Sequence, residues 1–230
     1  MEKLNVCIVG CGRIATLNVL GYKDHPHAQV YAVCDVDEDR ARAFAREAGA
    51  QVVYTDYEEA CADPNIHIMD LLTPHHLHCD MTVKACRGGK HVSVQKPMAL
   101  NLKECDEMIA AAREAGVQLK VYENFVFYPP YVKAKELLMA GEIGEPISIR
   151  LKMTAGSDKY GWKVFPSSWA WRMQEELSGG GELVFDDGNH KFSIARYFLG
   201  EPDTVFAMIG RTPIETPHYL DPQTGKSVVF

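Results

Sequence analysis

A short glycine motif near the start of the chain has the residue types and spacing of a phosphate-binding loop. Gly10, Gly12 and Ala15 form the pattern G-x-G-x-x-A, directly after an apolar run. The first glycine permits a tight turn, the second lets a pyrophosphate approach the backbone, and the small third residue lets a helix pack on the strand. Arg13 and Ile14 fill the positions at which the helix begins, where backbone N–H groups bind phosphates. We predict a dinucleotide-binding loop over these residues.

A carboxylate follows the next expected strand. Asp35 stands about 20 residues after the glycine motif, where an acid accepts hydrogen bonds from the adenosine ribose and repels the 2′-phosphate of NADP. Arg40, one helical turn later, weakens that preference, so we expect NAD as the cofactor, with NADP possible. Asp35 would otherwise only cap the following helix. A methyltransferase that binds S-adenosylmethionine is a competing interpretation, because it also uses a glycine loop and an acid after its second strand.

The elements that must position these residues alternate regularly over the first half of the chain. Short apolar runs alternate with helical patterns, which predicts parallel strands joined by right-handed crossovers. We expect strands at 4–9, 30–34, 51–54, 66–72, 91–94 and 117–121, and helices at 14–22, 37–48, 77–87 and 101–115. The predicted fold class is therefore α/β, with a doubly wound parallel Rossmann sheet in a domain of residues 1–122.

Composition excludes several classes of function. The net charge is −7 and no Lys/Arg-rich run is present, which argues against a nucleic-acid partner. No apolar stretch is long enough to span a bilayer, and the N-terminal apolar run is too short for a signal peptide. The seven cysteines include no C-x-x-C pair, which is typical of a reducing compartment. We expect a cytoplasmic protein without a membrane or nucleic-acid partner.

Four motifs together resemble the Gfo/Idh/MocA family of oxidoreductases, which includes glucose–fructose oxidoreductase and inositol dehydrogenase. Their order and spacing match the family along nearly the whole chain. The motifs are the glycine loop at 10–15, Thr73-Pro74 with His78, Gln95-Lys96-Pro97, and Asp186-x-Gly188-x-His190. The family usually has glutamate in place of Gln95. These residues count against the methyltransferase interpretation.

The resemblance implies an acid–base centre. Lys96 would lie between nicotinamide and substrate and help relay the proton of the reacting hydroxyl, and its ammonium suits this role because it stabilises a developing alkoxide. Asp186 and His190 would face the substrate, with His190 as the acid or base, since histidine is the residue type suited to proton transfer near neutral pH. Asp186 would orient the imidazole or a substrate hydroxyl. The alternatives are a solvated strand-end lysine, a helix-capping aspartate and a histidine on a helix surface.

The resemblance also implies further contacts with cofactor and substrate. Cofactor-binding positions would be Thr73, Pro74, His78, Gln95 and Lys96, together with Glu123 and Asn124 where the chain leaves the Rossmann domain. Asn124 would reach the substrate as well. Arg172 is a further substrate candidate from its residue type, independently of the resemblance, because a guanidinium can bind a hydroxyl pair or a carboxylate.

Aromatic residues and histidines in the same regions allow other interpretations. Lys152, Trp162, Trp169 and Trp171 precede a glycine-rich turn at 178–181, and tryptophans either stack on sugars or belong to the core. His75, His76 and His78 suggest a metal site, but no acidic or thiolate partner falls at ligand spacing, so we expect no metal.

The second domain, residues 123–230, is expected to be α+β. Helical patterns cover 131–139 and 187–199, and β-type runs cover 147–153 and 205–209. The resemblance implies an open, largely antiparallel sheet, through which relatives dimerise. This chain is expected to supply only the first strands of that sheet, so either it is a piece or another chain completes the sheet. A homo-oligomer through the C-terminal sheet is the predicted assembly.

We therefore expect an NAD(P)-dependent dehydrogenase. It would transfer a hydride between nicotinamide and a hydroxyl-bearing carbon of a sugar, polyol or related cyclic alcohol. Two other functions stay open. One is an NAD-dependent glycosidase that cleaves its substrate through transient oxidation, and the other is a non-catalytic NAD-binding partner or sensor.

Overall fold

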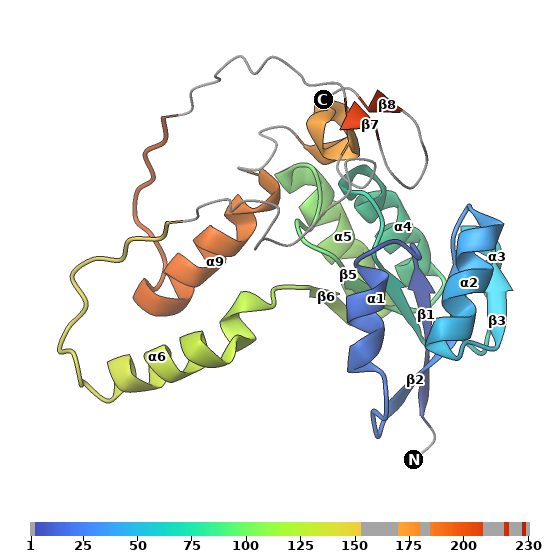
Figure 1. Cartoon of the computed structure of the whole chain (residues 1–230), viewed down its shortest axis with the longest axis horizontal. Helices are drawn as coiled ribbons and strands as arrows, with labels where there is room; N and C mark the ends of the chain where they lie inside the picture. Colours follow the sequence, from blue (N-terminus) through green and yellow to red (C-terminus); the bar gives the residue numbers. More distant parts are fainter. Residues whose placement is uncertain (1–2, 153–169, 180–184, 209–218, 221–226, 229–230) are drawn as a thin grey trace. The chain divides into compact units, whose positions relative to one another are not determined.

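The computed structural model describes residues 3–152, 170–179, 185–208, 219–220 and 227–228. The chain divides into two compact units (Figure 1). The first comprises residues 1–122 and 176–180, and the second comprises residues 123–175 and 181–230.

The first unit is built on a six-stranded sheet in which all neighbouring strands are parallel. Its strand order is β3-β2-β1-β4-β5-β6, so the direction of winding reverses between β1 and β4. The strands are β1 (Leu4–Val9), β2 (Ala28–Cys34), β3 (Val52–Tyr54), β4 (Ile68–Leu71), β5 (His91–Val94) and β6 (Leu119–Val121). This is the strand order of the dinucleotide-binding Rossmann fold, and it confirms the predicted α/β class.

Five helices connect the strands. They are α1 (Ala15–Asn18), α2 (Glu38–Ala48), α3 (Tyr57–Ala62), α4 (His78–Arg87) and α5 (Leu102–Ala115). The predicted helix at 14–22 is wrong in part, because α1 is only four residues long and continues as a 3-10 helix, Val19–Gly21. Helix α3 was not predicted, although its signal is present: Asp56 accepts hydrogen bonds from the backbone N–H groups of Glu58 and Glu59 at 2.7 and 3.0 Å.

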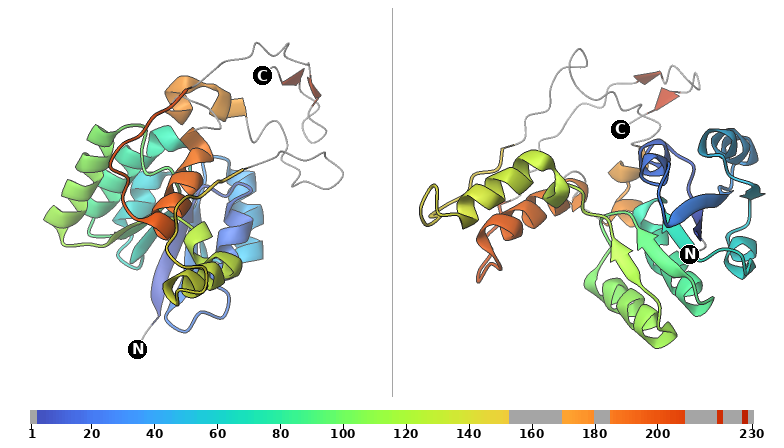
Figure 2. Two further views of the ribbon diagram at one scale, coloured as in Figure 1. Left: turned by 90° about the vertical axis from the view of Figure 1, so that its left-hand side faces the viewer. Right: turned by 90° about the horizontal axis from the view of Figure 1, so that it is seen from below.

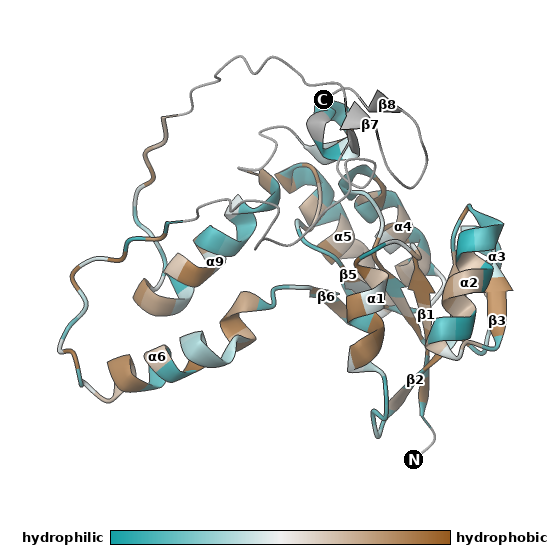
Figure 3. Ribbon diagram, viewed as in Figure 1, coloured by the Kyte–Doolittle hydropathy of each residue, from teal (hydrophilic) through white to brown (hydrophobic). Residues whose placement is uncertain are grey.

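Successive side chains along a strand point to opposite faces of the sheet, and both faces of this sheet are apolar. On β1, Cys7 and Val9 pack into a core that α4 and α5 cover, whereas Val6 and Ile8 pack into a second core beneath α1 and α2. The right-hand view of Figure 2 shows the helices on both sides of the sheet. In Figure 3, β1 and β3 are coloured hydrophobic, whereas α2 carries both colours because one of its faces is exposed.

A buried carboxylate lies on β4. The side chain of Asp70 is 0 % exposed, and the Tyr22 hydroxyl donates to its Oδ2 at 3.0 Å. The Tyr22 and Tyr122 hydroxyl oxygens are 3.4 Å apart. Burial raises the pKa of Asp70 from 3.8 to about 7, although hydrogen bonds from the two tyrosines oppose the shift. The folded state therefore holds a proton that the unfolded chain releases near pH 4.

This carboxylate is expected to make stability pH-dependent. Its contribution is fully present below about pH 4 and is lost as pH rises to about 7. Relative to an Asp70→Asn variant, the wild-type free energy of unfolding should fall by roughly 2–3 kcal/mol between pH 5 and pH 8. Urea unfolding at the two pH values measures the difference. The exposed-site variant Asp106→Asn should follow the wild type, and parallel pH profiles for wild type and Asp70→Asn would contradict the expectation.

The described part of the second unit is mostly helical. It contains a 3-10 turn at Phe125–Phe127, helix α6 (Pro129–Met139), a 3-10 turn at Ala170–Met173 and helix α9 (Gly188–Leu199). Two short strands, β7 (Tyr219–Leu220) and β8 (Ser227–Val228), pair antiparallel. Helix α7 (Glu175–Ser178) ends at Ser178, the first residue of the predicted glycine-rich turn.

The two strands predicted at 147–153 and 205–209 are wrong over their described residues, 147–152 and 205–208. Neither segment has regular secondary structure there. Ile147 is 98 % exposed and Phe206 is 87 % exposed. A β-type composition stabilises a strand only where the side chains pack on a half-buried sheet surface, and these side chains do not. The largely antiparallel sheet of this domain stays a prediction, with β7 and β8 its described pair. None of the described helices combines the length and apolarity needed to cross a membrane.

Candidate active site

The glycine loop leaves β1 with two glycines that have different structural roles. Gly10 has φ +89°, and a Cβ placed on it would lie 2.8 Å from the Leu72 carbonyl oxygen. A Cβ placed on Gly12 would meet none of the described protein atoms within 4 Å. Gly10 is therefore required by the fold itself, whereas Gly12 keeps an open space in front of the backbone. This space fits the approach of a pyrophosphate. Arg13 and Ile14 follow as half-buried residues ahead of α1.

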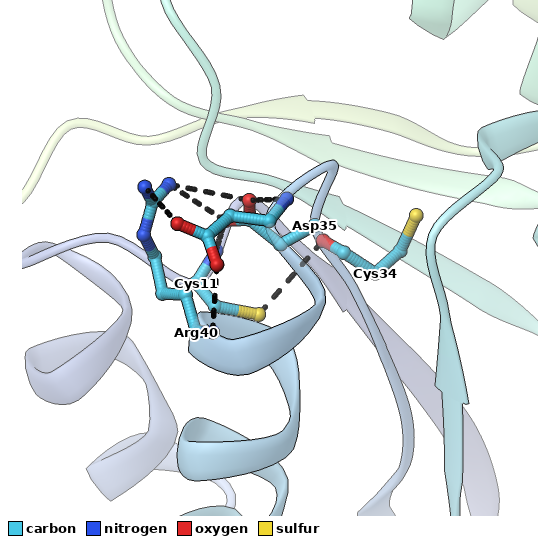
Figure 4. Close-up of polar contacts among 5 residues, drawn as sticks. Cys11, Cys34, Asp35 and Arg40 are labelled. Atoms are coloured by element: carbon cyan, nitrogen blue, oxygen red, sulfur yellow. Dashed lines mark hydrogen bonds and ion pairs between the residues drawn. The ribbon is translucent and has the colours of Figure 1, made fainter.

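Asp35 closes this loop from the carboxyl end of β2, and its side chain is only 5 % exposed. Its Oδ2 accepts from the backbone N–H of Cys11 at 2.8 Å, and its Oδ1 accepts from that of Asp37 at 2.9 Å. The Arg40 guanidinium lies 3.2 Å from Oδ1, and it also contacts Asp37 at 2.9 Å (Figure 4). The Asp35 carboxylate thus holds the glycine loop in place and also forms an ion pair with the Arg40 guanidinium.

Cys11, between the two glycines, is a packing residue. It is 6 % exposed, and its thiol donates to the Cys34 carbonyl oxygen at 3.8 Å (Figure 4). Burial, together with the nearby Asp35 carboxylate, raises its pKa to about 12, so the thiol stays protonated.

His78 joins two loops at the carboxyl edge of the sheet. Its ring nitrogens lie 2.9 Å from the carbonyl oxygens of Pro97 and Thr73, and the side chain is 0 % exposed. Burial lowers its pKa to about 4, so the imidazole is neutral and donates to only one of the two carbonyls. Any effect of His78 on a cofactor is therefore exerted through the Thr73-Pro74 and Lys96-Pro97 segments that it holds together.

Gln95 and Lys96 directly follow β5. Both are half-buried, and the Gln95 side-chain oxygen accepts from the backbone N–H of Lys96 at 3.0 Å. The peptide bond between Lys96 and Pro97 is cis. Because all strands of the sheet are parallel, Lys96 leaves the sheet at the same edge as the glycine loop and Asp35.

In the second unit, Asp186 is paired with an arginine. The Arg172 Nε donates to Asp186 Oδ2 at 3.0 Å, and the guanidinium carbon lies 4.3 Å from the centre of the Trp171 ring. Asp186 is 8 % exposed. It precedes Asp187, the N-cap residue of α9, whose side chain makes no capping hydrogen bond. Two of the predicted substrate residues, Arg172 and Asp186, are therefore in direct contact.

His190, in the first turn of α9, is paired with a different carboxylate. Its Nδ1 lies 2.9 Å from Glu123 Oε1 and 3.0 Å from Oε2. His190 is 8 % exposed, and the Phe125 ring packs against it with centres 4.6 Å apart. The sequence marked Glu123 as a cofactor residue and did not reveal this pairing, because the two residues are 67 positions apart.

The other candidate residues differ in burial. Asn124 is exposed at the start of the 3-10 turn of the second unit, and Lys152 is exposed in an irregular segment. Trp162 and Trp169 lie outside the described residues. His75, 2 % exposed, has its Nδ1 3.0 Å from the Ser178 carbonyl oxygen. Among the side chains that the structure describes, no group of three His, Cys, Asp or Glu residues is arranged to hold a metal ion.

Different family models match the N-terminal and C-terminal parts of the chain. The family model described as an oxidoreductase family with an NAD-binding Rossmann fold matches residues 4–123. The chain belongs to the Gfo/Idh/MocA family. A second model, the Gfo/Idh/MocA C-terminal domain, matches residues 131–224. Residues 4–123 thus form the NAD-binding Rossmann domain of a Gfo/Idh/MocA protein.

Curated members of the Gfo/Idh/MocA family include dehydrogenases of cyclic alcohols. Levoglucosan dehydrogenase of Pseudarthrobacter phenanthrenivorans is 29 % identical over 226 residues, which is 94 % of this chain and 56 % of that protein. Myo-inositol 2-dehydrogenase of Thermotoga maritima is 30 % identical over 205 residues, 89 % of this chain and 58 % of that protein. The chain spans little more than half the length of these relatives.

Solved structures of the family share the fold. Levoglucosan dehydrogenase in complex with NADH superimposes with a TM-score of 0.74 at 26 % identity, covering 87 % of this chain and 55 % of that one. GenD2 from gentamicin A biosynthesis, in complex with NAD, gives a TM-score of 0.72 at 28 % identity, covering 88 % and 55 %.

Proposed function

We propose that the protein is an NAD-dependent dehydrogenase of a polyol, sugar or related cyclic alcohol. The observation that carries this proposal lies in the first unit. Lys96, half-buried at the end of β5, stands at the same sheet edge as a glycine loop with an open approach and the buried Asp35. When bound, the nicotinamide accepts the hydride from the substrate carbon or returns it.

The chain's own residues supply binding and proton transfer in this proposal. Gly10, Gly12, Arg13 and Ile14 form the pyrophosphate loop, and Asp35 accepts from the ribose hydroxyls. Further cofactor contacts come from Thr73, Pro74, Gln95, Lys96 and Asn124. Lys96 stabilises the alkoxide that develops as the substrate loses its hydroxyl proton, and His190 takes that proton. Asp186 and Arg172 act as one ion pair that binds substrate hydroxyls, which fits the 3.0 Å contact between them.

Cofactor and substrate assays test the function directly. The chain is titrated with NADH and with NADPH by nicotinamide fluorescence, and then assayed for NADH formation with myo-inositol and levoglucosan. Tight NADH binding with NADH production supports the proposal. Sugar release from glycosides without accumulating NADH would favour the glycosidase instead, and NADH binding without turnover of any alcohol would favour a sensor.

The choice of cofactor is expected to depend on the charge of Asp35. An Asp35→Asn variant keeps an acceptor for the Cys11 N–H but removes the carboxylate that repels a 2′-phosphate, and it leaves Arg40 to bind that group. We expect the ratio of NADPH to NADH affinity to rise by at least about tenfold, the value of one charge-assisted hydrogen bond. Fluorescence titration measures both affinities.

Asp37→Asn is the matched control for this variant. Asp37 also contacts Arg40, at 2.9 Å, but its side chain is 44 % exposed. No contact between Asp37 and the ribose is proposed. It should leave the ratio near the wild-type value. An unchanged ratio in Asp35→Asn would show that Asp35 serves only to fix the loop.

The proposal also covers the compartment in which the protein works and its oligomeric state. All seven cysteines are free thiols, which fits a reducing compartment such as the cytoplasm. We propose a homo-oligomer through the C-terminal sheet, which sedimentation analysis of the protein would test.

A further inference from the structure

We infer that Glu123 is the positioning residue for His190: it holds the imidazole in the tautomer that carries its proton on Nδ1 and offers Nε2 as the base. The inference rests on the proposed acid–base role of His190. It differs from the sequence-based expectation, which gave Glu123 to the cofactor and left the orientation of the imidazole to Asp186.

The hydrogen bond between His190 and Glu123 decides which nitrogen of the imidazole carries the proton. Both oxygens of Glu123 lie within 3.0 Å of His190 Nδ1. An ionised carboxylate only accepts hydrogen bonds, so Nδ1 must be the donor. In a neutral imidazole the lone pair then belongs to Nε2, which is the nitrogen able to take a proton from a hydroxyl.

Glu123 is itself held in place. Its Oε1 accepts from the Phe125 backbone N–H at 3.0 Å, and its Oε2 accepts from Asn189 Nδ2 at 3.1 Å. Burial raises the pKa of Glu123, but the hydrogen bonds from His190 and the Phe125 N–H outweigh burial and bring the pKa below its ordinary value. The carboxylate is therefore charged at neutral pH and stabilises an imidazolium when one forms.

The other carboxylates near the start of α9 have different partners. Asp186 accepts from Arg172 at 3.0 Å, and Asp187 is 2.8 Å from Lys191. The Phe125 ring, with its plane at 59° to the imidazole, restricts rotation of the ring of His190. Glu123 and Phe125, two residues apart in the chain, thus define both the tautomer and the plane of the base.

Nitrogen NMR on the full chain, labelled with ¹⁵N-histidine, tests the tautomer without any need for turnover. Spectra are recorded with and without NADH, at a pH where the His190 shifts have stopped titrating, and a His190→Gln variant assigns the signals. In the wild type, Nδ1 should resonate as a protonated nitrogen and Nε2 as an unprotonated one. Glu123→Leu should lose or reverse this pattern, because it removes the carboxylate that accepts from Nδ1–H. Glu123→Asp should retain it, since the carboxylate is kept.

Kinetics supply a second measurement. Glu123→Gln should lower kcat by roughly 100-fold or more, as removal of the carboxylate from a carboxylate–histidine pair does in serine proteases, and should leave the dissociation constant of NADH near the wild-type value. Asp187→Asn removes a carboxylate from the same helix start and should change neither kcat nor the tautomer. Glu123→Asp should recover part of the lost kcat.

The outcomes separate this inference from the function on which it rests. An unprotonated Nδ1 in the wild type, or unchanged nitrogen shifts in Glu123→Leu, would overturn it. Weakened NADH binding with an intact tautomer would make Glu123 a cofactor residue. If no alcohol is oxidised while the tautomer responds as expected, the proposed function fails and the pairing of Glu123 with His190 stands.

Discussion

Replacement of Lys96 by methionine is expected to lower the turnover of the oxidised alcohol by roughly 10³-fold, the usual cost of removing one group that stabilises a developing oxyanion. Methionine is also unbranched and only one atom shorter than lysine, but it lacks the ammonium. NADH affinity should fall much less, because in the proposed site the glycine loop and Asp35 would still contact the cofactor. Steady-state kinetics on myo-inositol or levoglucosan, with an NADH titration in parallel, measures both effects.

Lys103→Met is the control, because Lys103 is 87 % exposed on α5 and its ion-pair contact with Glu107 is long, at 3.9 Å. It should turn over at the wild-type rate. A second comparison asks whether Lys96 and His190 act on the same proton. His190→Gln alone should cost about 10²–10⁴-fold in turnover. If one proton passes through both groups, the double variant should lose little more than the worse single variant. Full turnover in either single variant would exclude that residue from the chemistry.

Alanine at Gly10 and at Gly12 is expected to affect two different properties of the protein. At Gly10 the new Cβ would face the Leu72 carbonyl oxygen at 2.8 Å on a backbone with φ +89°. Steric overlap and left-handed strain should together cost about 3 kcal/mol of unfolding free energy. At Gly12 no described atom lies within 4 Å of the new Cβ, so stability should be retained. In the proposed cofactor site, that Cβ would occupy the approach of the pyrophosphate.

The two alanine variants together test whether the loop binds the pyrophosphate, and each variant serves as the control for the other. Gly12→Ala should bind NADH roughly tenfold to 100-fold more weakly, which corresponds to the loss of one charge-assisted hydrogen bond to phosphate. Its thermal midpoint should match the wild type, whereas that of Gly10→Ala should fall. Wild-type NADH affinity in Gly12→Ala would mean that this loop does not hold the pyrophosphate.

Local order in the sequence determined the cofactor half of this protein. The glycine loop directly follows β1, and Asp35 directly follows β2, so both end at one edge of a sheet as soon as the strands are parallel. The start of the predicted helix at 101–115 is local as well, because the Asn101 side chain accepts from the backbone N–H of Glu104 at 3.0 Å. Such features need only neighbours in the chain, which is why residue spacing was enough to predict them.

Tertiary structure alone decided which charged groups meet. Asp186 and His190 are four residues apart, yet Asp186 contacts Arg172 and His190 contacts Glu123. The shifted pKa of Asp70 likewise arises from burial on β4 beside Tyr22, a residue 48 positions away. The β-type run at 147–152 formed no strand, because a strand needs a partner and a surface to pack on. Contacts between distant residues depend on how the chain folds back on itself, and the spacing of residues in the sequence does not encode that directly.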